Sequence, residues 1–373
     1  MASAISIGDR TAPVSPYVVA PSFRLGYRPA LDGVRAFAVL MVMAHHADVP
    51  FFNGGSLGVD VFFVLSGFLI TSLLLQEWNQ TSTISFKKFY LRRALRLLPA
   101  LFLLLLSIEA FALIALRGAR FWEIQKAILA VLFYVSNWFS MHQPYRLGPL
   151  SHAWSLSIEE QFYFFWPPAL FALLFSRLRM SRLACVIAFL CIVASIHRAL
   201  LWTGPAAEWR IYVGLDTRID ELLAGGALAA ALSAGWGRLK SLRQFVRYSY
   251  LPSIAFILYL VARPLPPRIM FTLGWPAVEL CLAVILFRLI AWDHTTLHSL
   301  LASPPLVWIG RLSYGLYLWH FPIIQKIGGW TKLGLWRVPL AFLLTFAVAT
   351  LSFYLVEQPF LRLKSQFKGA GTK

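Results

Sequence analysis

A histidine and an arginine lie on one face of the first apolar segment. Arg35 and His46 are eleven residues apart, which on an α-helix separates them by about 20° around the axis and about 16 Å along it. His45 lies about 80° from Arg35, on the other side of that face. An imidazole can act as a general base, and a guanidinium group binds anions. We therefore interpret Arg35 and His46 as two points along one lined cavity; the alternative is that His46 packs against a neighbouring helix.

Two acidic positions could assist such a histidine. Glu159 and Tyr163 are four residues apart and share a helix face, from which Glu160 is rotated away. Asp60 lies just inside the outer end of the second apolar segment, as His46 does in the first. A carboxylate beside an imidazole can orient it or stabilise its charge. We expect Glu159 to have this role for His46, with Asp60 as the second candidate. The alternatives are an ion pair at the outer surface for Glu159 and a helix-dipole contact for Asp60.

Two further arginines form a candidate phosphate site. Arg93 and Arg96 are three residues apart in a basic run, so they point together from one helix face. Paired guanidinium groups bind phosphate bidentately. We expect both to face solvent, with Arg35 deeper in the protein. The alternative is a topology anchor that contacts anionic lipid.

Other polar residues give weaker signals. Asp216 and Arg218 open a later apolar segment together with two more acids, and the four could pair among themselves. Glu279 lies inside an apolar run, so it needs a partner or a proton. The three cysteines lie in apolar stretches without metal-binding spacing, so we expect them to pack as small apolar residues.

The composition identifies the environment in which these residues act. Of 373 residues, 59% are hydrophobic and 13% are charged, and the mean hydropathy is +0.67. Soluble domains have about 45–50% apolar and about 25% charged residues, so polar side chains are too few here to cover a water-facing surface. The sequence predicts an all-α, polytopic membrane protein and excludes a soluble enzyme, a disordered scaffold and a nucleic-acid-binding domain. The net charge of +18 comes largely from short loops, where cytoplasmic segments of membrane proteins carry Lys and Arg.

The elements that must position the candidate residues are apolar segments of about 20 residues. Eleven segments are candidates, and the fourth is short and carries Ser136 and Asn137. The segments lie near 31–49, 57–76, 97–116, 126–140, 156–176, 183–202, 216–234, 249–263, 271–291, 306–327 and 336–357.

Counting Lys and Arg indicates whether the fourth segment crosses the membrane. If it does not, and the N-terminus is cytoplasmic, 19 basic residues lie on the cytoplasmic side and 9 outside. If it crosses, the counts become 14 and 14. The positive-inside rule favours the first arrangement. The sequence therefore predicts about ten transmembrane helices, both termini in the cytoplasm, and residues 121–145 as a re-entrant or surface segment packed against protein.

Several motifs in a fixed order resemble the membrane-bound acyltransferase 3 family, whose members O-acylate sugars on lipopolysaccharide, exopolysaccharide, Nod factors and macrolides. The resemblance extends over residues 28 to 360, and motifs in this order are strongly specific. They are residues 28–35 with His46, 58–70, 89–99, 152–163, 216–218, 313–320 and 357–359.

The resemblance implies roles for individual residues. An essential histidine of the first helix falls on His46, whereas His45 stands where the family often has an aromatic residue. A functional arginine pair falls on Arg93 and Arg96. We assign polar residues of the later motifs to the substrate, and we assign no metal ligands. These substrate residues are His152, Glu160, Tyr163, Asp216, Arg218 and His320.

The chain is divided by this reasoning into three parts. Residues 1–28 are predicted to be a flexible cytoplasmic tail, 29–361 a transmembrane acyltransferase domain, and 362–373 a basic cytoplasmic tail. Some relatives carry a C-terminal extracytoplasmic esterase-like domain, and the resemblance here implies the stand-alone form.

The resulting hypothesis is an O-acyltransferase of the inner (cytoplasmic) membrane. It would move an acyl group, expected to be acetyl, from acyl-CoA to a hydroxyl of a carbohydrate or glycosylated acceptor, with no permanently bound cofactor. His46 would take the hydroxyl proton, and Arg93, Arg96 and Arg35 would hold the CoA phosphates. The main alternative is a transporter of an acyl group or polysaccharide precursor, with His46 and Glu159 as a proton relay. A structural subunit of a polysaccharide-export complex is a third possibility, but it gives no reason for an arginine and a histidine on one stripe.

Overall fold

Helices make up the fold of the part of the chain that the structure describes. The computed structural model describes residues 25–142, 147–292, 295–329 and 331–366, and no strand occurs among them. The predicted all-α class is therefore confirmed. The long helices follow the apolar segments of the sequence closely, because a run of that length satisfies its backbone hydrogen bonds internally. They are α1 (Pro29–His46), α2 (Leu57–Thr81), α3 (Phe86–Ala115), α6 (Trp154–Phe175), α7 (Met180–Leu201), α9 (Leu215–Ser233), α10 (Lys240–Ala262), α12 (Trp275–Ala291), α14 (Pro304–Gly328) and α15 (Arg337–Ser352).

Shorter helical elements connect the long ones. They lie mainly where the sequence lacks a continuous apolar run of membrane-spanning length. They are α4 (Gly118–Leu132), α5 (Ser136–His142), η1 (Gly148–Ala153), η2 (Pro205–Ala207), α8 (Glu208–Val213), η3 (Trp236–Arg238), α11 (Pro267–Ile269), η4 (Met270–Gly274), α13 (Thr296–Leu301), η5 (Thr331–Trp336), η6 (Phe353–Glu357) and α16 (Gln358–Gln366).

Six helical segments in the described residues are long and apolar enough to cross a membrane. Two of them, α3 and α7, expose large apolar side chains such as Leu106 and Leu200. Side chains of this kind are stable against lipid and costly against water. These segments support a multi-pass membrane protein. The number of about ten transmembrane helices remains a prediction.

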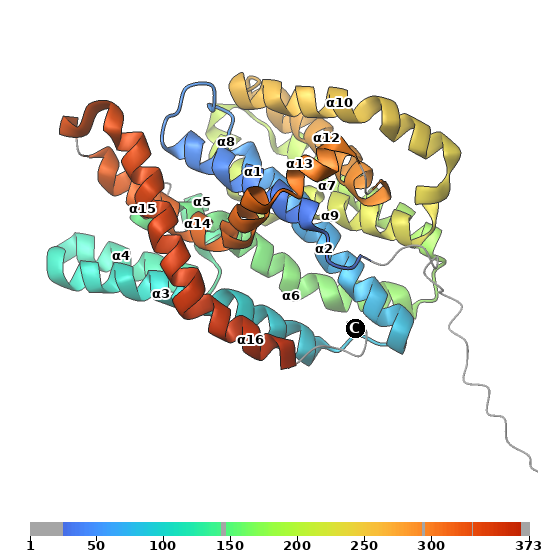
Figure 1. The fold of residues 1–373 in the computed structure, drawn as a ribbon, viewed down its shortest axis with the longest axis horizontal. Coiled ribbons are helices and arrows are strands. Elements are labelled where there is room, and N and C mark those ends of the chain that lie inside the picture. Colours follow the sequence, from blue (N-terminus) through green and yellow to red (C-terminus); the bar gives the residue numbers. More distant parts are fainter. Residues whose placement is uncertain (1–24, 143–146, 293–294, 330, 367–373) are drawn as a thin grey trace, which may run out of the picture.

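Helices α1, α2, α9 and α14 lie at the centre of the molecule, with α10 and α12 on one side and α3 and α4 on the other (Figure 1). The pair α2 and α9 packs closely because glycines face backbone on both helices. A Cβ atom at Gly67 would overlap the carbonyl of Leu222, and one at Gly225 would overlap the carbonyl of Val64. Small residues at helix crossings allow this approach in membrane proteins. Gly67 and Gly225 therefore allow α2 and α9 to pack closely.

The predicted boundaries at both ends need correction. Residues 1–24 and 367–373 lie outside the described residues, but the last four residues of the predicted N-terminal tail are described. Leu25 is buried, and the hydroxyl of Tyr27 donates to Oδ2 of Asp32 at 2.9 Å. At the other end α16 continues to Gln366, past the predicted domain end at 361. The tail prediction failed at these positions because contacts with distant residues, which composition does not reveal, hold them.

The segment predicted to re-enter forms α4 and α5, two short helices. Helix α4 packs along α3, and Nε2 of Gln125 donates to Oε2 of Glu109 between them at 2.6 Å. In α5 the Ser136 side chain is buried and its hydroxyl donates to the carbonyl of Ala153 at 2.9 Å. Buried contacts of this kind satisfy polar groups that lipid could not. The predicted segment extends through residues 143–145, which lie outside the described residues.

Candidate active site

Three histidines from three elements converge at one end of the bundle. His46 is the last residue of α1, His152 lies in η1, and His320 lies on α14. Nδ1 of His46 is 3.1 Å from Nε2 of His320, and the ring centroids of His152 and His320 are 5.2 Å apart. Helices α1 and α14 pack along each other and bring the two sequence-distant residues together. Phe321 touches the rings of both His46 and His152.

The hydrogen bonds of His320 determine which nitrogens of the pair carry protons. Nδ1 of His320 lies 2.6 Å from the carbonyl oxygen of Tyr317. A carbonyl only accepts, so this nitrogen carries the hydrogen. In a neutral ring Nε2 of His320 is then an acceptor, and Nδ1 of His46 must donate to it. His46 is left with an unprotonated Nε2, the atom that a general base requires.

The histidine contacts also bear on how the chain is threaded. His152 directly precedes α6, and His46 ends α1. Because both lie beside His320, the start of α6 is at the same end of the bundle as the end of α1. Helices α2 and α3 make two passes between them, so a third pass by residues 121–145 would place His152 at the opposite end. This geometry supports the prediction that the segment does not cross.

Cysteine labelling tests this topology. In a cysteine-free background, Ser176→Cys, in the exposed turn after α6, should resist a membrane-impermeant thiol reagent added outside intact cells. Ala206→Cys, in the connection after α7, should react and serves as the matched control. Labelling of Ser176→Cys together with protection of Ala206→Cys would show that residues 121–145 cross the membrane, because every later segment would then change sides.

An elongated cavity of about 460 Å³ lies beside the histidines, and we call it the arginine-lined cavity. Arg35, Arg93 and Arg96 line it, and Ser155 and Tyr317 also contribute to its wall. Much of the remaining wall is apolar. The lining includes Val59, Phe62, Phe63, Leu69, Ile70 and Leu156.

The two arginines of α3 differ in their surroundings. Arg93 forms a bidentate pair with Glu160, with Nη2 at 2.7 Å and Nε at 3.0 Å from Oε1, and its guanidinium stacks on the ring of Tyr163. The Arg93 side chain is 16% exposed, so the expectation that it faces solvent is wrong. Arg96 is exposed, and within the described chain no hydrogen bond or ion pair reaches it. Arg96, together with Arg35, is therefore better placed than Arg93 to receive an anion.

Glu159 belongs to the arginine-lined cavity and not to the histidine pair. Its Oε1 accepts a hydrogen bond from the hydroxyl of Ser66 at 2.5 Å, and both residues line that cavity. His320, not Glu159, is hydrogen-bonded to His46. The sequence-based pairing of Glu159 with His46 is thus corrected. Ser66 is therefore a residue of the arginine-lined cavity.

A second cavity, of about 320 Å³, lies on the other side of the histidines. We call it the histidine-lined cavity, since His46 contributes to its wall together with Asp48, Gln325 and Arg337. Among the described residues the two cavities share no lining residue. Tyr317 lies between them: it lines the arginine-lined cavity, and its ring centroid is 5.3 Å from that of His320.

Hydrogen bonds hold this partition in place. The hydroxyl of Tyr317 donates to the carbonyl of His152 at 3.0 Å and lies 2.6 Å from the hydroxyl of Ser155. The ring nitrogens of His152 are buried and have no hydrogen-bond partner among the described residues. Tyr317, His152 and His320 therefore contact one another between the two cavities.

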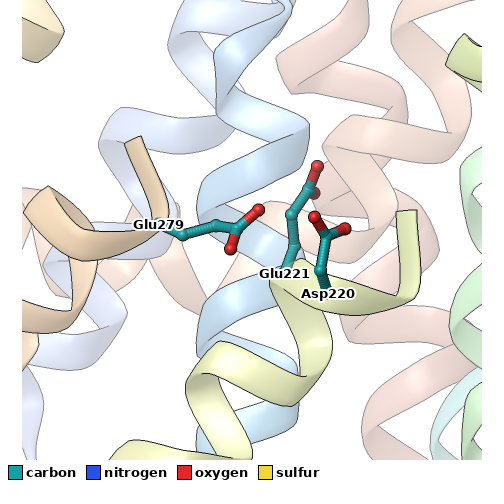
Figure 2. Close-up of side chains that lie close together, drawn as sticks. All are labelled: Asp220, Glu221 and Glu279. Carbon is teal, nitrogen blue, oxygen red and sulfur yellow. The ribbon is translucent and has the colours of Figure 1, made fainter. Parts of the chain in front are cut away.

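A buried charged cluster lies in α2, α7, α9 and α12. Arg218 is 3.2 Å from Oδ1 of Asp60 and 3.0 Å from Oε1 of Glu221, and Arg198 pairs with Asp220 and, at 3.7 Å, with Glu279. Figure 2 shows Glu279 pointing from α12 toward the two acids of α9. Each of the four carboxylates has an arginine partner. Two guanidinium groups thus pair with four carboxylates, and pairing of this kind offsets part of the cost of burying the charges.

Ion pairs inside this cluster and beside it correct three assignments. Asp60 pairs with Arg218, so its carboxylate is committed there and not to His46. Arg218 is 1% exposed and lies on the ring of Trp275, so it is not placed to meet a substrate. Asp216 bonds Arg210 at 2.7 Å and His197 at 3.0 Å and lines neither of the two cavities. The need of Glu279 for a partner, expected from the sequence, is met by Arg198.

Several residues of the site carry no signal in the sequence by themselves. Tyr317 and Ser155 fall inside recognised motifs, but no feature of the sequence around them indicates that they lie between two cavities. Asp48, Gln325 and Arg337 gather at the histidine-lined cavity from three segments. Asp48 has a φ of 53°, an uncommon conformation for a residue other than glycine. Only the tertiary arrangement identifies these positions.

Comparison with known proteins supplies the family. Residues 28–356 match the model of an acyltransferase domain. The putative peptidoglycan O-acetyltransferase YrhL of Bacillus subtilis is 35% identical over 89% of the chain, which covers 55% of that protein. The peptidoglycan O-acetyltransferase OatA of Listeria monocytogenes is 33% identical over 89% of the chain and 56% of its own length.

A putative O-acetyltransferase of Staphylococcus aureus is 33% identical over 90% of the chain and 58% of its own length. The chain thus spans a little more than half the length of these relatives. No solved structure matches it significantly. The match of the family model to most of the chain, with these relatives, confirms the resemblance seen in the motifs: the chain belongs to the acyltransferase 3 family.

Proposed function

We propose that the protein is a membrane O-acetyltransferase that uses an acyl-CoA donor and a carbohydrate acceptor. The observation that carries the proposal is the position of His46. Its unprotonated Nε2 belongs to a ring that lines one cavity, while an arginine-lined cavity approaches the same histidine cluster from the other side. The names of the relatives support acetyl as the group and a cell-wall polysaccharide as the acceptor class.

The arginine-lined cavity suits an acyl-CoA. Its apolar walls fit a narrow thioester-bearing arm, and Arg35 and Arg96 offer positive charge for phosphate. The thioester would lie toward Ser155 and Tyr317. The hydrogen of the Tyr317 hydroxyl is committed to the carbonyl of His152, so the hydroxyl of Ser155 would turn to donate to the thioester carbonyl oxygen as negative charge develops on it. Arg93 contributes through position: its pair with Glu160 joins α3 to α6.

The histidine-lined cavity suits a sugar. Asp48, Gln325 and Arg337 provide donors and acceptors for hydroxyl groups around His46. In the proposed reaction Nε2 of His46 takes the proton of the attacking hydroxyl, a bond forms from that oxygen to the acyl carbon, and the carbon–sulfur bond breaks. The leaving thiolate receives this proton from His46, so the base is restored and the products are an ester and CoA thiol. His320 keeps the base in the required tautomer.

We propose that the protein resides in the cell membrane with both termini in the cytoplasm. The proposed donor occurs in the cytoplasm, and the basic start of α3 at Lys87 and Lys88 is predicted to lie on that side. The arginine-lined cavity then faces the donor and the histidine-lined cavity faces outward. A cell-wall acceptor would be reached from the outer side.

Substitution of Arg96 tests the donor. Loss of a charge-assisted hydrogen bond costs about 1.5–3 kcal/mol, so Arg96→Ala should raise the KM for acetyl-CoA roughly 10- to 100-fold. The measurement is acceptor-dependent release of CoA thiol by protein in lipid vesicles. Arg92→Ala is the matched control, since Arg92 lies on the same helix, 3.9 Å from Glu77, and lines neither cavity. An unchanged KM for Arg96→Ala, or no thiol release by the unaltered protein, would favour the transporter.

A further inference from the structure

A third hollow, of about 370 Å³, adjoins the arginine-lined cavity, and we call it the mouth. Tyr27, Arg35, Arg96 and Tyr314 line both spaces, so the two are continuous. The mouth lies between the segment that precedes α1, the start of α14, and the residues around η6 and α16. Its own lining adds Arg28, Asp32, Arg311, Phe353, Glu357 and Leu361.

The mouth carries an excess of positive charge. Four arginines line it against the carboxylates of Asp32 and Glu357. Asp32 already accepts from Arg35 at 3.0 Å and from Tyr27 at 2.9 Å. Arg96 has no ion-pair partner among the described residues. Arginines that outnumber the carboxylates around them favour a multiply charged anion such as a phosphate ester.

Tyr27 is an exposed aromatic ring that is nevertheless fixed in place. The residue is 63% exposed. Its hydroxyl donates to Asp32 and accepts from Nη2 of Arg311 at 2.9 Å, and the guanidinium of Arg311 lies 5.7 Å from the ring centroid. A fixed, solvent-accessible ring beside a guanidinium plane is a surface on which a nucleobase stacks, and it provides cation–π contact as well.

We propose that the mouth binds the nucleotide end of the acyl-CoA, with adenine stacked on Tyr27 beside Arg311 and phosphates held by Arg96 and its neighbours. This inference rests on the proposed function and divides donor recognition in two. The arginine-lined cavity binds the thioester arm, because the walls of this cavity are largely apolar. The mouth binds the charged nucleotide. Tyr27 and Arg311 then determine whether the donor must be a CoA ester.

A pair of donors separates this role from others. Acetyl-CoA carries the nucleotide, whereas S-acetylpantetheine has the same thioester arm without it. In vesicles of zwitterionic lipid, Tyr27→Ala and Arg311→Ala should each raise the KM for acetyl-CoA about 5- to 100-fold. The KM for S-acetylpantetheine should change less than about twofold. Tyr27→Phe keeps the ring and should retain most of the preference for acetyl-CoA.

The outcomes distinguish this inference from the proposed function. Equal losses with both donors would mean that Tyr27 acts only by positioning Asp32 and Arg35, and the inference would be wrong. An effect that appears only in vesicles with anionic lipid would assign the mouth to a lipid headgroup and would also overturn it. If the unaltered protein is active and Tyr27→Ala and Arg311→Ala both show a normal KM for acetyl-CoA, the inference is wrong and the proposed function still stands. If the unaltered protein uses neither donor, the proposed function fails first.

Discussion

Replacing His46 with alanine should lower the rate of acyl transfer about 10²- to 10⁴-fold, the usual cost of removing a general base. The reason is the arrangement of protons around it. His320 is committed to the carbonyl of Tyr317 through Nδ1, so it accepts from His46 and leaves Nε2 of His46 without a proton. No other ring nitrogen within the described residues lines the histidine-lined cavity. The measurement is acetyl transfer to a carbohydrate acceptor by protein in vesicles.

His45 provides the matched control for this experiment. Its Nδ1 lies 3.3 Å from the carbonyl of Phe52, and it lines neither of the two cavities. His45→Phe should therefore retain activity, and both variants should insert normally because each makes α1 more apolar. Near-normal transfer by His46→Ala, with loss in His45→Phe, would reverse the assignment. Normal transfer by both would contradict the role of histidine as base.

Replacing Arg218 with alanine should strongly destabilise the protein. The change would leave Asp60 and Glu221 buried without their arginine, and breaking a buried pair in this way costs about 3–5 kcal/mol. The cluster joins α2 to α9, so its loss should reduce the yield of folded protein and lower the melting temperature in detergent. Arg198 remains paired with Asp220 and does not replace the missing charge.

Arg210→Ala is the control for charge removal alone. Arg210 pairs with Asp216, but the two side chains are 35% and 37% exposed, and exposed pairs contribute only about 0–1 kcal/mol. The melting temperature of the Arg210→Ala protein should stay close to that of the unaltered protein. Equal stability of Arg218→Ala and Arg210→Ala would show that the buried cluster is not a structural element.

The sequence predicted helices well because hydrophobic run length is a local property. The segment predicted near 57–76 became α2, and that near 183–202 became α7, with ends shifted by a few residues. Arg35 and His46 line different cavities, so the interpretation of their shared helix face as one lined cavity is wrong. The family motifs placed His46, Arg93 and Arg96 at the site.

Partnerships between helices could not be predicted in the same way. Azimuth on one helix says which side chains point together, but it does not say which helix they meet. Asp60 meets Arg218 because glycines let α2 and α9 approach closely, and His46 meets His320 because α1 lies along α14. Both contacts join residues more than 150 positions apart. Sequence reasoning therefore found several participants but assigned the wrong carboxylates to the histidine.

The separation of the two cavities has a consequence for the cell. Tyr317, His152 and His320 contact one another between the two cavities, which share no lining residue among those described. In the proposed reaction only an acyl group and a proton move between donor and acceptor, and neither substrate travels through the protein. The proposed reaction therefore needs no continuous ion-conducting path through the protein, so acyl transfer need not dissipate an electrochemical gradient across the membrane.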